Sequence, residues 1–191
     1  MTRNELAGGG TSSDVLVVSV GQDGTAGPAV PRGAAHEAPA VLHLAVSVQL
    51  VDLEGGWLLQ RRAGSKAAFA DRWANSCCTH PAPGEDLAAA AMRRVREELG
   101  LEIDELIRAG MFTYRATDPQ SGMVEYEQDH VFAAVADTRG AVAAPEEISA
   151  LLRPPFSAAM DIVASDAGTP WAAEVLRRSF DALHQRRQLP L

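Results

Sequence analysis

The stretch from residue 86 to residue 100 constrains the fold most, because it has the pattern of an amphipathic helix with a defined end. Its apolar residues recur every four positions: Leu87, Ala91, Val95 and Leu99. Gly100 follows at the point where a left-handed residue commonly ends a helix. The pattern therefore predicts a helix over residues 86–99. On a second face of this helix, Arg94 and Glu98 lie one turn apart.

The segments before this helix alternate between apolar and polar residues, as half-buried strands do. From Leu42 to Val51 the even-numbered residues are apolar, so His43 is expected to point away from the apolar face. The DLEGG loop that follows predicts a hairpin, with Trp57–Arg62 as the returning strand. An earlier β-branched run, Val15–Val20, predicts another short strand.

Two further strands are predicted after the helix, over Met111–Ala116 and Met123–Ala136, joined by the turn sequence DPQSG. Because side chains alternate along a strand, Glu125 and Glu127 project from the same face of the second one. Two carboxylates on one face can share a cation. The last forty residues have a helical pattern, with Trp171 at the start of an amphipathic stretch.

Composition excludes several classes of protein. With 191 residues, 47% of them apolar, and a net charge of −8, residues 14–191 are expected to form one globular domain, and residues 1–13 a disordered tail. The sequence has no apolar run long enough to span a membrane and no secretory pattern, so we expect a cytoplasmic protein without a membrane partner. Its acidic balance argues against nucleic-acid binding. The two cysteines are adjacent, which excludes a disulfide framework.

The segment from Thr79 to Leu101 resembles the Nudix box, a loop–helix element whose carboxylates hold magnesium against a diphosphate. The matching residues are Glu85, Arg93, Val95, Glu97, Glu98, Gly100 and Leu101. Two positions depart from the box, because Thr79 replaces a glycine and Arg94 replaces a carboxylate. The loss of that carboxylate argues against diphosphate hydrolysis but not against diphosphate binding. The resemblance implies an α+β fold in which helices sandwich a mixed β-sheet.

Over most of its length the chain is similar to the type 1 isopentenyl-diphosphate isomerases, Nudix-fold enzymes that shift a double bond instead of hydrolysing a diphosphate. The similarity runs from about Val15 to the region of Trp171. It rests on His36 and His43 followed in order by LLQRRAGSK, WANSCCTHP, FTYRATD, GMVEYE and TPW. The resemblance implies interconversion of isopentenyl and dimethylallyl diphosphate by protonation and deprotonation through a tertiary carbocation.

A metal site is predicted from three histidines and two carboxylates. They are His36, His43, His80, Glu125 and Glu127. Three nitrogen and two oxygen ligands suit an octahedral divalent ion such as Mn, Mg or Zn. The corresponding residues bind one metal in the family that the chain resembles.

The resemblance also implies the groups that carry the reaction. Cys78 and Glu127 would form the acid/base pair, and Tyr114 would hydrogen-bond to the carboxylate and orient it. Cys77 is the competing thiol, but Cys78 has the family spacing to the next histidine, so Cys77 is assigned to packing. The indole face of Trp171 would stabilise the carbocation without offering a nucleophile.

Positive charge is needed at the diphosphate end of the substrate. The residues that match the phosphate contacts of the family are Arg32, Arg62, Lys66 and Arg94. Lys66 is the only lysine among 17 basic residues, which fits a point contact to phosphate, although chance explains it equally well. A magnesium ion accompanying the diphosphate would be held by Glu98, helped by a main-chain carbonyl near Cys78.

Two other functions remain open at this stage. A Nudix diphosphohydrolase would release phosphate, and a non-catalytic Nudix module would bind a diphosphate without turnover. The small-molecule partner is a prenyl diphosphate in the leading interpretation. Because Tyr126 and Thr79 differ from the residues common at these positions in the family, a variant prenyl diphosphate is also compatible with the sequence.

Overall fold

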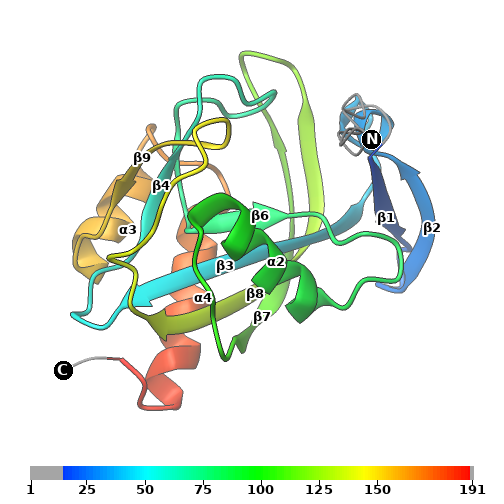
Figure 1. The fold of residues 1–191 in the computed structure, drawn as a ribbon. Helices are drawn as coiled ribbons and strands as arrows, with labels where there is room; N and C mark the ends of the chain where they lie inside the picture. The colour runs from blue at the N-terminus through cyan, green and yellow to red at the C-terminus, as the bar shows by residue number, and fades with distance from the viewer. Residues whose placement is uncertain (1–14, 190–191) are drawn as a thin grey trace, which may run out of the picture.

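The computed structural model describes residues 15–189, which form nine strands and four helices (Figure 1). The elements are β1 (Leu16–Val20), β2 (Ala26–Pro31), α1 (Arg32–His36), β3 (His43–Asp52), β4 (Leu59–Arg62), β5 (Trp73–Ala74), β6 (Cys77–Thr79), α2 (Leu87–Leu99), β7 (Ile107–Thr117), β8 (Val124–Ala136), β9 (Ile148–Leu152), α3 (Phe156–Ala164) and α4 (Ala172–Gln185). The tail predicted for residues 1–13 lies outside the described residues. Among the described residues, no helix is long and apolar enough to cross a membrane.

The central sheet is mixed, and its order is β2-β1-β3-β8-β7, with β6 paired to β3 outside this path. The long strands β3 and β8 run parallel, with His43 opposite Glu127, while β7 and β8 form an antiparallel pair. The strand β6 pairs with β3 on the side away from β8, so that Ser47 lies opposite Cys78. Strands β6, β3 and β8 therefore bring side chains from distant parts of the sequence side by side across the sheet.

Helices cover both faces of this sheet, which confirms the predicted α+β fold (Figure 1). Successive side chains of β3 point to opposite faces of the sheet. On one face, Val46, Val48 and Leu50 pack against α2. On the opposite face, Val51 packs with residues of α3 and α4. His43 and Ser47 share this second face, as the period of two in the sequence predicts.

The helix α2 begins and ends where the sequence predicts. The carboxylate of Asp86 accepts hydrogen bonds from the backbone N–H groups of Ala88 and Ala89, so it caps the first turn. At the other end Gly100 has φ 63°, a left-handed conformation that a glycine adopts without strain. Because both ends are fixed, the polar face of α2 holds its side chains at a defined position beside β6.

The hairpin predicted after β3 is only partly correct. Trp57 pairs back to Val51, but β4 then leaves the central sheet and lies between β5 and β9 in a separate three-stranded sheet. The reason is that β6 already occupies the edge of β3 at Val46–Val48, where a continuing hairpin strand would have to pair. The second sheet carries Arg62 toward the same end of the molecule as β6.

The C-terminal helices confirm the helical pattern predicted for the last forty residues. Trp171 is the residue before α4, and Gly168 lies against α3 so closely that an added Cβ would clash with the backbone of Val163. Backbone hydrogen bonds between Trp73 and residues 167–169 fix this approach. The segment before Trp171, which carries no motif, is thus held by close backbone packing.

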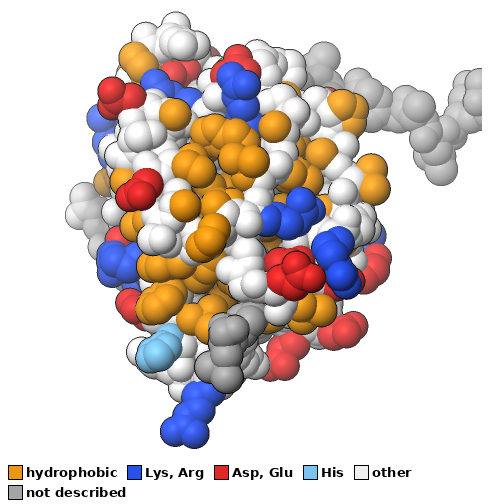
Figure 2. All heavy atoms as spheres, turned by 90° about the vertical axis from the view of Figure 1, so that its left-hand side faces the viewer, with side chains coloured by type: hydrophobic (Ala, Val, Ile, Leu, Met, Phe, Trp, Pro, Cys, Tyr) orange, Lys and Arg blue, Asp and Glu red, His pale blue; other side chains and the backbone are white. Residues whose placement is uncertain are grey.

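Apolar side chains gather on the side of the molecule that carries α3 and β9 (Figure 2). The rings of Trp57, Phe156 and Phe180 pack together with centroid distances of 4.4 to 6.3 Å, Phe156 stacked on Phe180 and Trp57 tilted against both. This cluster anchors α3 and α4 on the sheet. It lies away from the polar end of β3, where the predicted site residues gather.

Candidate functional site

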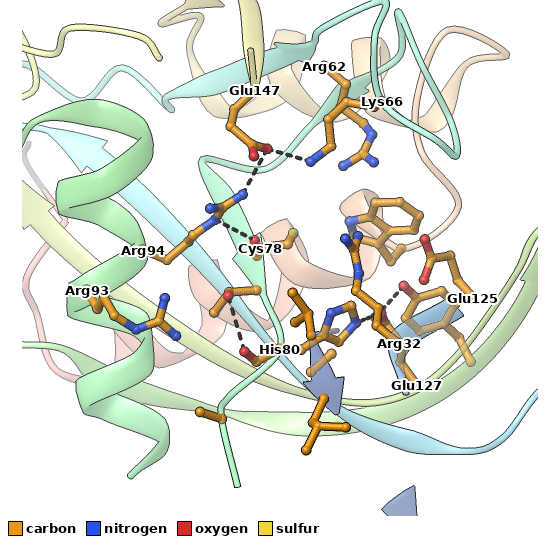
Figure 3. Close-up of a pocket in the computed structure, with 17 residues that line it drawn as sticks. Arg32, Arg62, Lys66, Cys78, His80, Arg93, Arg94, Glu125, Glu127 and Glu147 are labelled. Carbon is orange, nitrogen blue, oxygen red and sulfur yellow. Dashed lines mark hydrogen bonds and ion pairs between the residues drawn. The ribbon is translucent and has the colours of Figure 1, made fainter. Parts of the chain in front are cut away.

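A cavity of ≈ 410 Å³ lies at the end of the central sheet where β3 begins and β6 ends, and Figure 3 shows the side chains around it. It brings together most of the residues predicted from the sequence. Those that line it are Cys78, Glu127, Tyr114, Trp171, Arg32, Arg62, Lys66, Arg94, His80 and Glu125. His36 and His43 are buried beside it, and Glu98 is buried on α2 without lining it.

The three histidines and two carboxylates form one cluster. Their ligand atoms all lie within 4.8 Å of one another. The register of β3 and β8 places His43 opposite Glu127, His36 lies at the end of the short helix α1, and His80 follows β6. The Nε2 atom of His36 is 2.9 Å from Glu125 Oε2, and His80 Nε2 is 2.9 Å from Glu127 Oε1.

Hydrogen bonds outside the cluster orient two of its rings. His36 Nδ1 lies 2.7 Å from the carbonyl oxygen of Arg32, and His43 Nδ1 lies 2.7 Å from that of Val41. When each Nδ1 carries the proton that these carbonyls accept, each Nε2 presents a lone pair to the cluster. Such outer hydrogen bonds are usual for metal-binding histidines.

The inner atoms of the cluster lack enough protein donors to satisfy them. His36 Nε2 and Glu125 Oε2 are buried and have no hydrogen-bond partner of good geometry, although they lie 2.9 Å apart. His43 Nε2 and His80 Nε2 are 3.1 Å apart, and both lie close to Glu127 Oε1. Buried polar atoms without a hydrogen-bond partner are costly unless a cation satisfies them. This donor set fits a divalent metal.

Glu127 connects the metal cluster to the cavity. Burial opposes its ionisation, but its contacts with His43 and His80 outweigh burial and hold the pKa of Glu127 well below its usual value. Its other oxygen, Oε2, accepts a 2.6 Å hydrogen bond from the Tyr114 hydroxyl. The two residues are cross-strand partners on β7 and β8, which explains this contact. Glu127 is therefore an oriented carboxylate.

The two adjacent cysteines point to opposite faces of the sheet. Cys77 is fully buried in the core beneath α2, whereas Cys78 lines the cavity. Sγ of Cys78 donates to Asn75 Oδ1 at 3.3 Å and lies 3.3 Å from the Ser47 hydroxyl. Burial and the nearby Asp129 carboxyl raise the pKa of Cys78 to about 12, so the side chain is a neutral thiol.

Aromatic rings surround Trp171 on several sides. Phe69 meets its ring edge-on at a centroid distance of 5.3 Å, and the ring of Tyr114 is tilted against it at 5.7 Å. The guanidinium of Arg62 lies over the indole, 5.6 Å from the centroid. Trp171 is 4% exposed, so its indole is packed on most sides where it lines the cavity.

Two of the predicted phosphate-binding cations, Lys66 and Arg94, lie at the other end of the cavity and share a carboxylate. Glu147 Oε2 is 2.5 Å from Lys66 Nζ and 2.8 Å from Arg94 Nη2, as the dashed lines in Figure 3 mark. Arg62 is also engaged, because it donates to the carbonyl oxygens of Phe69 and Ala68. A diphosphate entering here would compete with Glu147 for its cations. Arg32 lies instead beside Glu125 and Glu127, at the end of the metal cluster (Figure 3).

The two groups predicted to hold magnesium both contact Arg94. Arg94 Nε lies 2.5 Å from Glu98 Oε1 and 3.3 Å from the carbonyl oxygen of Cys78. Burial raises the pKa of Glu98, against the effect of Arg94, and Gln60 donates to its second oxygen at 3.1 Å. A carboxylate and a main-chain carbonyl therefore converge on one cation beside the cavity.

Arg93, which also lines the cavity, pairs with two carboxylates of the Nudix-like segment, Glu85 and Glu97, and lies 3.2 Å from Glu97 Oε2. Both oxygens of Glu85 accept hydrogen bonds from Arg93, at 2.8 and 2.9 Å. Oε2 of Glu85 also accepts from the backbone N–H of Ala82. This pair ties the loop before α2 to the middle of the helix.

Sequence reasoning missed four polar residues at the site: Ser47, Asn75, Asp129 and Glu147. The alternation of β3 and β8 provides a signal for two of them, since Ser47 shares a face with His43 and Asp129 shares one with Glu127. Glu147 lies in a loop before β9 without a motif, so only the fold brings it to Lys66.

Comparison with known proteins relates this fold and site to one family. A model of the NUDIX domain matches residues 41–178. The chain is 45% identical over 159 residues to an isopentenyl-diphosphate Delta-isomerase of Nocardia farcinica, which covers 82% of this chain and 90% of that protein. It is 40% identical over 172 residues to a protein of the same name from Streptomyces griseus, covering 90% of this chain and 85% of that one.

A solved structure supports the fold independently. A crystal structure of a Deinococcus radiodurans protein superposes with a TM-score of 0.69, covering 86% of this chain and 99% of that one. At 23% sequence identity this likeness concerns the fold alone. The family relation therefore rests on the domain match and on the sequence relatives.

Proposed function

Because the chain belongs to the Nudix superfamily and, within it, to the family of isopentenyl-diphosphate Delta-isomerases, we propose that it interconverts isopentenyl diphosphate and dimethylallyl diphosphate. One observation carries the proposal beyond the family name. A single cavity is lined by a thiol and an oriented carboxylate near the metal cluster, and by cations at its other end. An allylic isomerisation of a diphosphate requires both sets.

Cys78 and Glu127 are the proposed acid/base pair. One of them gives a proton to the terminal alkene carbon, and the other removes a proton two carbons away, so that the double bond moves and no atom is lost. The supporting observations are that both side chains line the cavity and that each is fixed by hydrogen bonds. Tyr114 donates to Glu127 and keeps its carboxylate oriented.

The proposed metal site consists of His36, His43, His80, Glu125 and Glu127. Its mixed nitrogen and oxygen donors suit Mn, Mg or Zn. When bound, a divalent ion supplies positive charge that fixes the Glu127 carboxylate at the cavity wall. The buried, unpaired atoms His36 Nε2 and Glu125 Oε2 support this assignment.

Trp171 is the proposed partner of the carbocation. Addition of a proton to the alkene leaves a tertiary cation, which water would trap, so the cavity has to exclude water and offer negative potential without a nucleophile. The indole of Trp171, buried among Phe69 and Tyr114, supports this role because it offers a π system and no nucleophile to the cavity.

The diphosphate is proposed to bind against Lys66 and Arg94 at the opposite end of the cavity, with Arg62 and Arg32, which line the same cavity, as the other predicted contacts. Magnesium carried with the substrate would be held by Glu98 and the carbonyl oxygen of Cys78, which already converge on the guanidinium of Arg94. Binding energy gained at this remote end holds the reacting carbons between the acid and the base.

Turnover in heavy water tests the proposal. The protein, with Mn or Mg added, is incubated with isopentenyl diphosphate in D2O. We expect dimethylallyl diphosphate that carries deuterium, because protonation uses exchangeable protons. Released phosphate without isomerised product would instead indicate a diphosphohydrolase. Binding of the diphosphate with neither product would indicate a non-catalytic module.

A further inference from the structure

Ser47 is a buried polar residue in the middle of β3 that the mechanism above leaves without a role. It is 1% exposed and lies between β6 on one side and β8 on the other. A hydroxyl in the interior of a sheet is costly unless it is hydrogen-bonded. The contacts of Ser47 therefore indicate why a serine is placed there.

Ser47 bridges a thiol and a carboxyl group. Its Oγ donates a 2.7 Å hydrogen bond to Asp129 Oδ2 and lies 3.3 Å from Cys78 Sγ. The sheet enforces this row, since Ser47 is the register partner of Cys78, and Asp129 is on the same face of the adjacent strand β8. Asp129 is 1% exposed, so its carboxyl group is held as firmly as the serine.

Asn75 fixes the other side of the sulfur. Its amide nitrogen donates to the carbonyl oxygens of Val48 and Cys77, at 3.1 and 2.9 Å. These bonds determine which way the amide faces, so Oδ1 is directed to Cys78 Sγ. Because the Ser47 proton is donated to Asp129, Ser47 Oγ faces the sulfur as an acceptor. The sulfur thus lies between two acceptors for its single proton, Asn75 Oδ1 and Ser47 Oγ.

We propose that Ser47, anchored by Asp129, is a positioning residue that holds the Cys78 sulfur toward the cavity. The inference rests on the role proposed above for Cys78. Proton transfer to or from carbon requires the donor and acceptor within hydrogen-bond reach, and displacement of a reacting group by about 1 Å can lower a rate about 100-fold. Removal of Ser47 leaves the thiol with Asn75 alone, so the sulfur can turn away.

The test compares Ser47→Ala with a matched buried serine. Ser76 is also fully buried, and its hydroxyl bonds to the backbone of Leu58 and Leu50 without touching Cys78. For Ser47→Ala we expect kcat with isopentenyl diphosphate to fall between about 10- and 100-fold, with KM and metal content unchanged. Ser76→Ala should lower the thermal midpoint while kcat stays as in the parent protein.

Two changes at Asp129 separate positioning from packing. Asp129→Asn keeps an oxygen that accepts from Ser47, so kcat should stay within about threefold of the parent value. Asp129→Leu keeps the branching of the side chain but has no acceptor, and its kcat should fall as in Ser47→Ala. The double variant Ser47→Ala/Asp129→Leu should be no slower than either single one, because both changes break the same contact.

The outcomes distinguish this inference from the proposed function. Turnover in Cys78→Ser at the parent rate would overturn the proposed function itself. If Cys78→Ser is inactive while Ser47→Ala keeps the parent kcat, only the positioning role is wrong. Equal kcat for Asp129→Asn and Asp129→Leu would also refute it, and this pair decides the matter if Ser47→Ala does not fold.

Discussion

The two ends of the cavity are built in different ways. The end with Cys78 and Glu127 is formed by neighbouring strands, where Cys78 Sγ lies 3.3 Å from Oγ of its register partner Ser47 and Glu127 accepts a hydrogen bond from its register partner Tyr114. The opposite end is formed by a loop, a helix and side chains already in ion pairs, as Glu147 with Lys66 shows. Strand pairing fixes the positions of the side chains at the first end. At the second end, Lys66 and Arg94 can exchange Glu147 for another anion.

Because the two ends are built differently, substitutions at each end should change different kinetic constants. A reaction on carbon needs groups held in one geometry before the substrate arrives, and a sheet supplies it. A diphosphate is a flexible anion that can replace a carboxylate as the partner of an arginine or a lysine. We therefore expect substitutions at the end with Cys78 and Glu127, the sheet end, to change kcat. Substitutions at the end with Lys66, Arg94 and Glu98, the charged end, should change KM and the magnesium requirement.

The largest expected effect is that of Cys78→Ser, for which kcat should fall about 1,000-fold or more, because the proton carrier is lost. Metal content, measured after dialysis, should stay at the parent value. Cys77→Ser is the matched control, since its thiol lies in the core beneath α2, and it should lose stability but keep turnover. An inactive Cys77→Ser beside an active Cys78→Ser would reverse the assignment.

Glu127→Gln should have the next largest effect, because this carboxylate belongs to both the metal cluster and the acid/base pair. We expect kcat to fall about 100-fold or more and metal to be lost on dialysis. Glu98→Gln is the comparison from the charged end, where the magnesium concentration that gives half-maximal rate should rise. Full metal content with normal turnover in Glu127→Gln would contradict both roles.

The sequence predicts the sheet end better than the charged end, and the reason is physical. A period of two predicts that Glu125 and Glu127 share a face, and the structure has them in one cluster. The same rule requires the adjacent residues Cys77 and Cys78 to point to opposite faces once they lie on a strand. Local pattern is sufficient where regular strands position the side chains.

Other features depend on contacts between distant segments. Glu147 meets Lys66 across 81 residues, and no pattern in the sequence indicates that pairing. The path of β4 was missed because the strand that displaces it from β3, β6, is only three residues long. The need for a glycine at position 168 is likewise visible only in the folded structure, where the backbone of α3 lies against it. Tertiary packing determines these features, so local sequence patterns do not predict them.

Glu147→Gln should have a smaller effect, confined to binding. Removing its charge frees Lys66 and Arg94 and removes a carboxylate that repels the diphosphate. We expect magnesium-free inorganic diphosphate to bind about threefold more tightly, measured by calorimetry, with kcat unchanged. Weaker binding, or a higher magnesium requirement, would mean that Glu147 takes part in holding the metal that accompanies the substrate.

The smallest expected effect is that of Glu85→Gln. This change breaks the ion pair between Glu85 and Arg93 and leaves the proposed catalytic groups unchanged. Hydrogen bonds from Arg93 lower the pKa of Glu85 in the folded protein, although burial opposes them. A carboxyl group with a lowered folded-state pKa stabilises the fold above its unfolded-state pKa, about 4.3, and this contribution disappears as the pH falls through the folded value. Because Arg93 is 37% exposed, solvent screening limits the contribution to about 0.2 to 1 kcal/mol.

Urea unfolding of Glu85→Gln and its parent at pH 7 and pH 3 measures this contribution. The variant should be less stable at pH 7, and the difference should shrink at pH 3, where the parent carboxylate takes up a proton. Glu102→Gln is the matched control, because its pair with Arg96 also joins an arginine of α2 to a carboxylate but is more exposed to solvent. A difference for Glu85→Gln that stays constant with pH would show that Glu85 acts through packing of the loop before α2 and not through its charge.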